Sequence, residues 1–198
     1  MNQGKRGPRE RAEGSTGEEI LKAAYKAFAH YGYEGTTVRQ IAREAGVDPA
    51  MISYRFGSKE KLWRAVLENL KERLQFFIQK AEALADRNAE DAAYGLIDLI
   101  LEISLENPEF PMIISQSAGS AAFDEVRKEL IDPFITSAVP ALSLAMEAGV
   151  FPKSDPKMAL FILLSGVSVT IMAYDGDKAK IRNKIDAFLK QMVRKKEM

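Results

Sequence analysis

Residues 36–59 read TTVRQIAREAGVDPAMISYRFGSK, and this stretch decides the fold. Thr37 is followed by Gln40 three positions later, a capping box that begins a helix. The next apolar positions recur at helical spacing, which gives this helix one buried face. Gly46 follows directly and predicts the end of the helix, because a left-handed C-terminal cap favours a residue without a Cβ.

A second, short helix is predicted directly after the glycine. Asp48 is a good N-cap, and Pro49 stands at the first helical position, where its missing N–H is not needed. Ile52 and Phe56 recur at helical spacing and are expected to face inward. Two capped helices separated by a glycine turn predict a helix-turn-helix, the motif that places its second helix in the major groove of DNA.

Helical patterns also cover the rest of the chain. Thr16 and Glu19 form another capping box, which predicts a helix to about Tyr31. A long helix is expected from Lys59 to about Ala85, linking the N-terminal part to the remainder. Further helices are expected over residues 88–105, 111–117, 123–149, 158–174 and 178–195, with a kink or break at Pro133, Pro140 or both. No strand-like alternation occurs, so the expected fold class is all-α.

The composition excludes several classes of protein. The 198 residues include no cysteine, which excludes disulfides, thiolate metal sites and cysteine nucleophiles. His30 is the single histidine, and the chain has no glycine-rich phosphate loop or metal-ligand spacing. We therefore expect no enzyme, no metal and no cofactor. Residues 1–19 contain no apolar core segment of the kind found in signal peptides, which predicts a cytoplasmic protein.

The charges are distributed unevenly although the formal net charge is zero. Residues 1–66 contain 12 Lys and Arg against 8 Asp and Glu, whereas the remainder contains 16 against 20. A basic half joined to an acidic half is typical of a nucleic-acid-binding head on a larger body, although mixed surface charge alone would give a similar imbalance. Residues 1–14 form a basic arm that is expected to be mobile, either as a DNA-contacting arm or as a frayed terminus.

The last two predicted helices have the pattern of a packing surface. Residues 158–174 are apolar almost all the way round, which favours a helix buried on all sides over a membrane span, because the segment is short and has acidic flanks. The following helix carries one apolar stripe, formed by Ile181, Ile185, Phe188, Leu189 and Met192. These two helices either close the core of a monomer or pair with the same helices of a second copy around a twofold axis.

One longer run resembles a known protein family. Residues 20–63 read ILKAAYKAFAHYGYEGTTVRQIAREAGVDPAMISYRFGSKEKLW, and they closely resemble the N-terminal domain of the TetR family of bacterial transcriptional regulators. The resemblance implies a homodimeric repressor with a three-helix DNA-binding head and a larger regulatory domain. Together with the residue patterns above, we expect a flexible arm at 1–14, a DNA-binding domain at 15–58 and a regulatory and dimerisation domain at 59–198. The apolar pattern of the last two helices predicts that the dimer forms through the helices at 157–174 and 178–194. In this family a small molecule usually binds the regulatory domain and releases the palindromic operator.

The residues expected to contact double-stranded DNA lie in and around the helix-turn-helix. They are Thr36, Thr37, Pro49, Ala50, Met51, Ser53, Tyr54, Arg55 and Lys59. Thr37, Tyr54 and Lys59 match phosphate-contacting positions of the family, and the recognition-helix positions face the groove. By its chemistry, Arg55 can reach either a phosphate or a guanine edge. The sequence departs from the commonest family pattern at Ser53, usually aromatic, at Arg55, frequently histidine, and at Pro49-Ala50, usually a more polar pair.

The small-molecule effector is not identified by the sequence. An apolar pocket with a polar contact is expected among the middle helices, lined by Phe77, Phe110, Met112, Gln116, Phe123, Phe134 and Met146. For each of these side chains, ordinary core packing is the favoured explanation over a place in a pocket. Two functions therefore compete: a ligand-responsive DNA-binding regulator, and a helical adaptor or architectural protein without sequence-specific operator binding.

Overall fold

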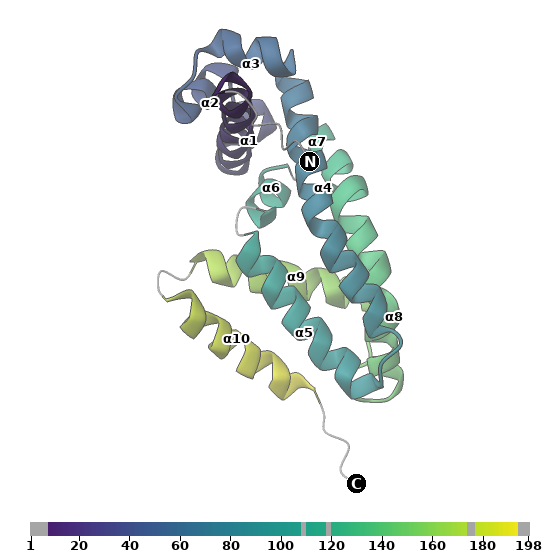
Figure 1. Ribbon diagram of the computed structural model, residues 1–198. Coiled ribbons are helices and arrows are strands. Elements are labelled where there is room, and N and C mark those ends of the chain that lie inside the picture. The colour runs from purple at the N-terminus through teal and green to yellow at the C-terminus, as the bar shows by residue number, and fades with distance from the viewer. Residues whose placement is uncertain (1–7, 108–109, 118–119, 174–176, 194–198) are drawn as a thin grey trace, which may run out of the picture. The chain divides into compact units, whose positions relative to one another are not determined.

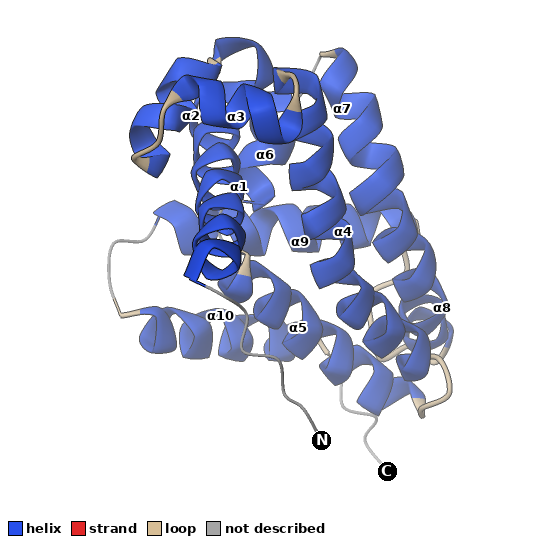
Figure 2. Ribbon diagram, turned by 45° about the horizontal axis from the view of Figure 1, so that its top comes forward, coloured by secondary structure: helices blue, strands red, loops and turns tan. Residues whose placement is uncertain are grey.

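The structure is a computed structural model that describes residues 8–107, 110–117, 120–173 and 177–193 (Figure 1). All secondary structure in these ranges is helical, and none of the described residues forms a strand (Figure 2). The expected all-α fold class is therefore confirmed. The chain divides into two compact units, and the division falls between Asn69 and Leu70 inside a continuous helix. The expected domain boundary was the start of that helix, at Lys59.

The first unit contains a three-helix group and the beginning of a long fourth helix (Figure 1). Its elements are α1 (Pro8–Gly35), α2 (Val38–Ala45), α3 (Pro49–Phe56) and the first part of α4 (Lys59–Leu84). The second unit contains the remainder of α4, then α5 (Ala89–Glu106), α6 (Phe110–Ser117), α7 (Ala121–Val126), the π-helical turn η1 (Arg127–Ile131), α8 (Asp132–Glu147), α9 (Pro156–Ala173) and α10 (Lys178–Met192).

The start of α1 differs from the sequence-based expectation. The helix begins at Pro8, so Thr16 lies inside it and does not cap its beginning. Residues 8–14 are therefore helical and do not form the mobile arm that was expected, whereas residues 1–7 lie outside the described part of the chain. The physical reason is that a run rich in Arg, Glu and Ala favours a helix, and Pro is tolerated in a first turn.

The helix-turn-helix forms as its caps predict. The Gln40 N–H donates to Thr37 Oγ1 over 3.2 Å, and Gln40 Oε1 accepts from the Thr37 N–H over 2.7 Å, which completes the capping box. Gly46 adopts the left-handed conformation, with φ 67° and ψ 29°. Asp48 Oδ1 accepts from the Ala50 N–H over 2.7 Å, and Pro49 stands at the start of α3. Each of these local predictions is confirmed.

An aromatic cluster holds the three-helix group on the beginning of α4. Trp63 packs edge-on against Phe28 with ring centroids 5.0 Å apart, and it lies 5.7 Å from the ring of Tyr33. Ile41 from α2 and Ile52 from α3 are almost fully buried. Since every element of the group contributes a buried side chain, the direction of α3 is fixed by packing as well as by its caps.

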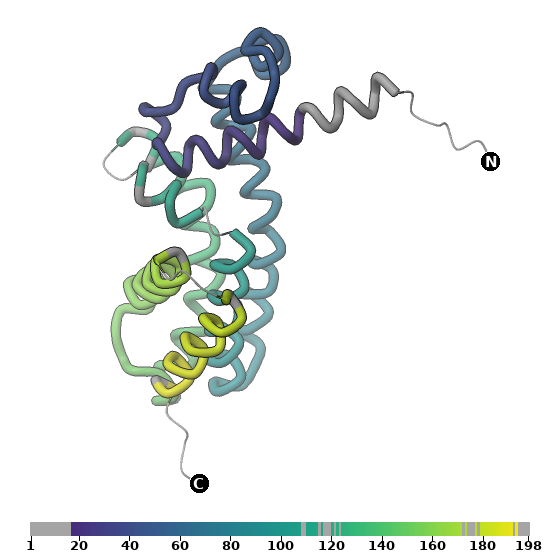
Figure 3. Tube along the Cα trace, turned by 90° about the vertical axis from the view of Figure 1, so that its left-hand side faces the viewer, coloured from purple at the N-terminus to yellow at the C-terminus, as the bar shows by residue number. Residues whose placement is uncertain are grey.

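The second unit is organised around α5, which packs against α8, α9 and α10 (Figure 3). Half of its side chains, including Ile97, Ile100 and Leu101, are buried. A buried hydrogen bond of 2.8 Å joins Ser104 of α5 to Ser168 of α9. A core helix that is buried on several sides must satisfy such hydroxyls internally, and Ser104 also donates to the Ile100 carbonyl.

The expected interruption of the helix over residues 123–149 takes the form of a π-helical turn. In η1 the Asp132 N–H donates to the Arg127 carbonyl, five residues back, immediately before Pro133. Pro140 lies inside α8, which continues through it. Lys71 of α4 donates to Glu129 of η1 over 3.0 Å, and this hydrogen bond, together with the lysine charge, lowers the pKa of the Glu129 carboxyl below its ordinary value.

One stretch of the described chain has the length and apolarity that a membrane crossing would need. It covers Asp124–Glu147, and 56% of its apolar window is buried within the protein. Core helices of soluble proteins share these properties, so the stretch does not by itself indicate a membrane protein.

Replacing Gly46 with Ala is expected to lower the free energy of unfolding by about 1 kcal/mol, because a Cβ is strained at positive φ. No atom lies within 4 Å of where the new Cβ would stand, so no steric contact adds to this cost. Urea denaturation followed by circular dichroism measures the effect. Gly35→Ala is the matched control, because Gly35 lacks a positive φ; an equal loss in both variants would contradict the explanation.

Candidate nucleic-acid interface

The short helix α3 presents an exposed face made of the residues that were expected to meet DNA. Tyr54 is 90% exposed and Met51 is 44% exposed, whereas Ile52 is almost fully buried against the group. The other exposed members of this face are Pro49, Ala50, Ser53 and Arg55. The structure therefore brings together the recognition-helix residues that the sequence predicted.

The N-terminus of α2 forms a second part of this region. Thr37 is exposed beside the first turn of the helix, where free backbone N–H groups favour a phosphate. Arg39 and Arg43 are also exposed on α2, and the sequence prediction did not include them. The helical spacing could have predicted both arginines. Ile41 and Ala42 define the buried face of α2, so Arg39 and Arg43 must point outward.

Thr36 does not belong to this surface, and its expected side-chain contact with DNA is corrected. Thr36 is only 1% exposed, and its hydroxyl donates to the Gly32 carbonyl over 2.7 Å and lies 3.1 Å from the Ala27 carbonyl. The hydroxyl therefore turns back onto backbone carbonyls of α1, and Gly32, the nearer of the two, has non-helical backbone angles. Thr36 is therefore a buried residue that follows the end of α1 and has a structural role.

Lys59 has a structural contact in addition to its expected role. Its Nζ donates to the Tyr33 carbonyl over 2.9 Å and lies 4.4 Å from the centre of the Tyr33 ring. The ammonium group has three donors, so a phosphate can still be bound by the others. Lys59 therefore joins the end of α1 to the start of α4 while it remains partly exposed.

The residues expected around an effector lie on several helices of the second unit. Phe77 of α4, Phe110 of α6, and Phe134 and Met146 of α8 are buried, Met112 is half-buried and Gln116 is exposed. The side chain of Phe123 lies outside the described residues. Met146 also borders a surface hollow of about 300 Å³ beside Ser143 and Lys153. These placements suit core packing, and none of them distinguishes a pocket from a core.

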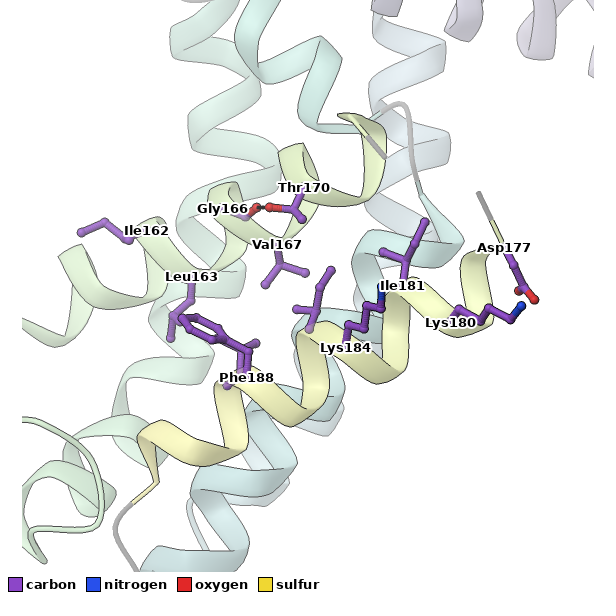
Figure 4. A pocket seen from close by; sticks show the side chains of 12 residues that line it. Ile162, Leu163, Gly166, Val167, Thr170, Asp177, Lys180, Ile181, Lys184 and Phe188 are labelled. Carbon is purple, nitrogen blue, oxygen red and sulfur yellow. Dashed lines mark hydrogen bonds between the residues drawn. The ribbon is translucent and has the colours of Figure 1, made fainter. Parts of the chain in front are cut away.

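An apolar groove runs between α9 and α10 (Figure 4). It measures about 730 Å³ and is lined mostly by Ile162, Leu163, Val167, Ile181, Ile185 and Phe188, with Lys180 and Lys184 at its edge. Ile162 is 63% exposed and Phe188 is 64% exposed, although both side chains are large and apolar. The expectation that α9 is buried on all sides is therefore wrong for the single chain, since one face of the helix is open.

Comparisons with known proteins agree with this geometry. Residues 20–66 match the family model described as bacterial regulatory proteins, tetR family. The chain is similar to the transcriptional repressor NicS of Pseudomonas putida, with 32% identity over 154 residues that cover 75% of this chain and 70% of NicS. It is also similar to the transcriptional regulator RutR of Escherichia coli, with 29% identity over 161 residues that cover 79% of this chain and 74% of RutR.

The solved structures extend the likeness to the fold. HlyIIR, a hemolysin II transcriptional regulator, is 25% identical, with a TM-score of 0.63 over 93% of this chain and 99% of that one. Both curated relatives are helix-turn-helix transcriptional regulators, and the similarity to NicS extends well beyond the helix-turn-helix. This chain is accordingly a DNA-binding transcriptional regulator, and it belongs to the TetR family.

Proposed function

We propose that the protein is a repressor that binds a palindromic operator as a homodimer and is released by a small molecule. The observation that carries this proposal is the exposed face of α3, which is held by two caps and a buried Ile52 while Met51 and Tyr54 point outward. The similarity to the repressor NicS supports repression over activation. Such a protein acts where its operator is, in the cytoplasm.

The chemistry of α3 suggests how it meets the duplex. Pro49, Ala50 and Met51 offer apolar contact of the kind that thymine methyl groups accept in the major groove. The exposed hydroxyl of Tyr54 can donate to a phosphate, and the N-terminus of α2 beside Thr37 can bind another. Phosphate contacts fix the register, whereas contacts with base edges select the sequence.

The open face of α9 and α10 supports a second copy of the chain as the partner. Gly166 lies on this face, and no atom lies within 4 Å of where a Cβ on it would stand, so a helix can approach closely there. Large exposed apolar side chains border it, among them Ile162 and Phe188. Pairing of the same face on two copies buries these side chains around a twofold axis. A twofold dimer also suits DNA recognition, because helix-turn-helix proteins commonly bind as dimers to two half-sites about 34–36 Å apart.

The remaining parts of the proposal concern the regulatory half. We assign DNA binding to the first unit and dimerisation and effector binding to the second, which holds the α9–α10 face and the buried aromatic residues. The candidate effector site stays the set around Phe77, Phe110 and Phe134. A change in the effector site reaches the DNA-binding unit through α4, because this helix continues without a break from one unit into the other.

The DNA-binding part is tested with DNA from the region upstream of the protein's own coding sequence. The purified protein is expected to retard this fragment more strongly than a scrambled fragment across a salt series. Tyr54→Phe should weaken specific binding about tenfold, because it removes one hydrogen bond to a charged phosphate. Its salt slope should stay unchanged, since no charge is lost.

Glu90→Gln is the control for the tyrosine variant, because Glu90 is exposed on α5 in the second unit and should not affect DNA binding. Equal retardation of both fragments, erased by salt, would favour the adaptor over the regulator. Unchanged affinity of Tyr54→Phe would remove this residue from the interface.

The dimer is tested by sedimentation at micromolar concentration. The wild type is expected at twice the 22.0 kDa mass of the chain, whereas Ile162→Lys and Phe188→Lys should shift it towards the monomer by placing charges on the apolar face. Phe76→Lys is the matched control, because Phe76 is a 55% exposed aromatic on α4, outside this face. A monomeric wild type would refute the assignment, and so would dissociation by the control variant alone.

A further inference from the structure

Gly17 of α1 is buried, and the side chain that approaches it most closely comes from the recognition helix. A Cβ built on Gly17 would lie 2.8 Å from Nε, 2.8 Å from one terminal nitrogen and 2.9 Å from Cζ of Arg55. Three guanidinium atoms at nearly the same short distance indicate that the flat group lies face-on over the glycine. Only a residue without a side chain leaves room for this arrangement.

The charge of Arg55 remains available in this position. Arg55 is exposed, and none of the residues whose side chains the structure describes forms a hydrogen bond or ion pair with it. The guanidinium thus packs against the α1 backbone at Gly17, and no acceptor among the described side chains takes its N–H donors, which can therefore meet an acceptor on a ligand. The group also sits in the last turn of α3, close to the exposed Tyr54.

We infer that Gly17 is a positioning residue for DNA recognition, which seats the Arg55 guanidinium so that its donors meet the operator. The inference rests on the proposed function. A free arginine side chain loses rotamer entropy when it binds, and a guanidinium that is already seated loses less. Glycine inside a helix is otherwise unfavourable compared with alanine, so its presence in α1 is explained by the arginine that covers it.

The test is a four-protein cycle that compares wild type, Gly17→Ala, Arg55→Ala and the double variant on an operator selected by the wild type. Fluorescence anisotropy at fixed salt measures each affinity. Gly17→Ala should weaken operator binding by about threefold to tenfold in the wild-type background, because the new Cβ displaces the guanidinium. In the Arg55→Ala background the same substitution should have no effect on affinity.

A second readout separates positioning from a structural role. Gly17→Ala should not lower the thermal midpoint, because the displaced group is the far end of a flexible side chain and alanine favours the helix. The NMR signal of the Arg55 Nε–H should nevertheless move in the free, folded variant. Gly35→Ala serves as the matched control and should leave this signal unchanged.

The outcomes distinguish the inference from the proposed function. Suppose that the wild type selects an operator. If Gly17→Ala then binds this operator as tightly as the wild type or more tightly, the inference is overturned while the proposed function stands. The same holds if Gly17→Ala weakens binding as much in the Arg55→Ala background as in the wild type. An unmoved Arg55 signal would overturn it as well. If the wild type selects no operator, the proposed function fails and the inference fails with it.

Discussion

The contact between α1 and the start of α4 is the interaction on which the helix-turn-helix unit depends. Trp63 packs edge-on against Phe28 and beside Tyr33, and Lys59 donates to the carbonyl of Tyr33. This cluster joins the helix-turn-helix to a helix that continues into the second unit. Because the direction of α3 is fixed within its group by packing, a displacement of α4 would carry the recognition helix with it.

The two units present different kinds of surface. The first has the exposed face of α3 on a packed helix, and the second has the open apolar face of α9 and α10. On α3 the caps and the buried Ile52 fix the helix backbone before any ligand arrives, so less backbone entropy is lost on binding. On α9 and α10, by contrast, Ile162 and Phe188 are exposed in the single chain and gain from burial only when a partner covers them. In the proposed dimer, subunit association therefore depends on burial of apolar surface, whereas DNA binding depends on contacts that α3 presents in advance.

The sequence predicted those features that depend on local chemistry. The capping box of Thr37, the left-handed Gly46 and the N-cap of Asp48 are set by nearest neighbours in the chain, and all three form as expected. The sequence patterns did not predict features that depend on the tertiary fold. The seating of Arg55 over Gly17 brings together residues of α3 and α1, and no periodicity in the sequence records such a contact. The burial of Thr36, whose hydroxyl turns back onto carbonyls of α1, likewise has no periodic signal. For the same reason the effector site was not identified, since its candidate side chains come from several helices.

The most direct test of the central claim places a photocrosslinking amino acid at position 51 on the exposed face of α3 and, for comparison, at position 90 on α5. Each protein is bound to a selected operator and irradiated, and the crosslinked bases are mapped on both strands. The account predicts crosslinks from position 51 to base edges at two symmetric places about one helical turn apart, and none from position 90. Crosslinks from position 90 alone, or none from position 51 on a bound operator, would contradict it.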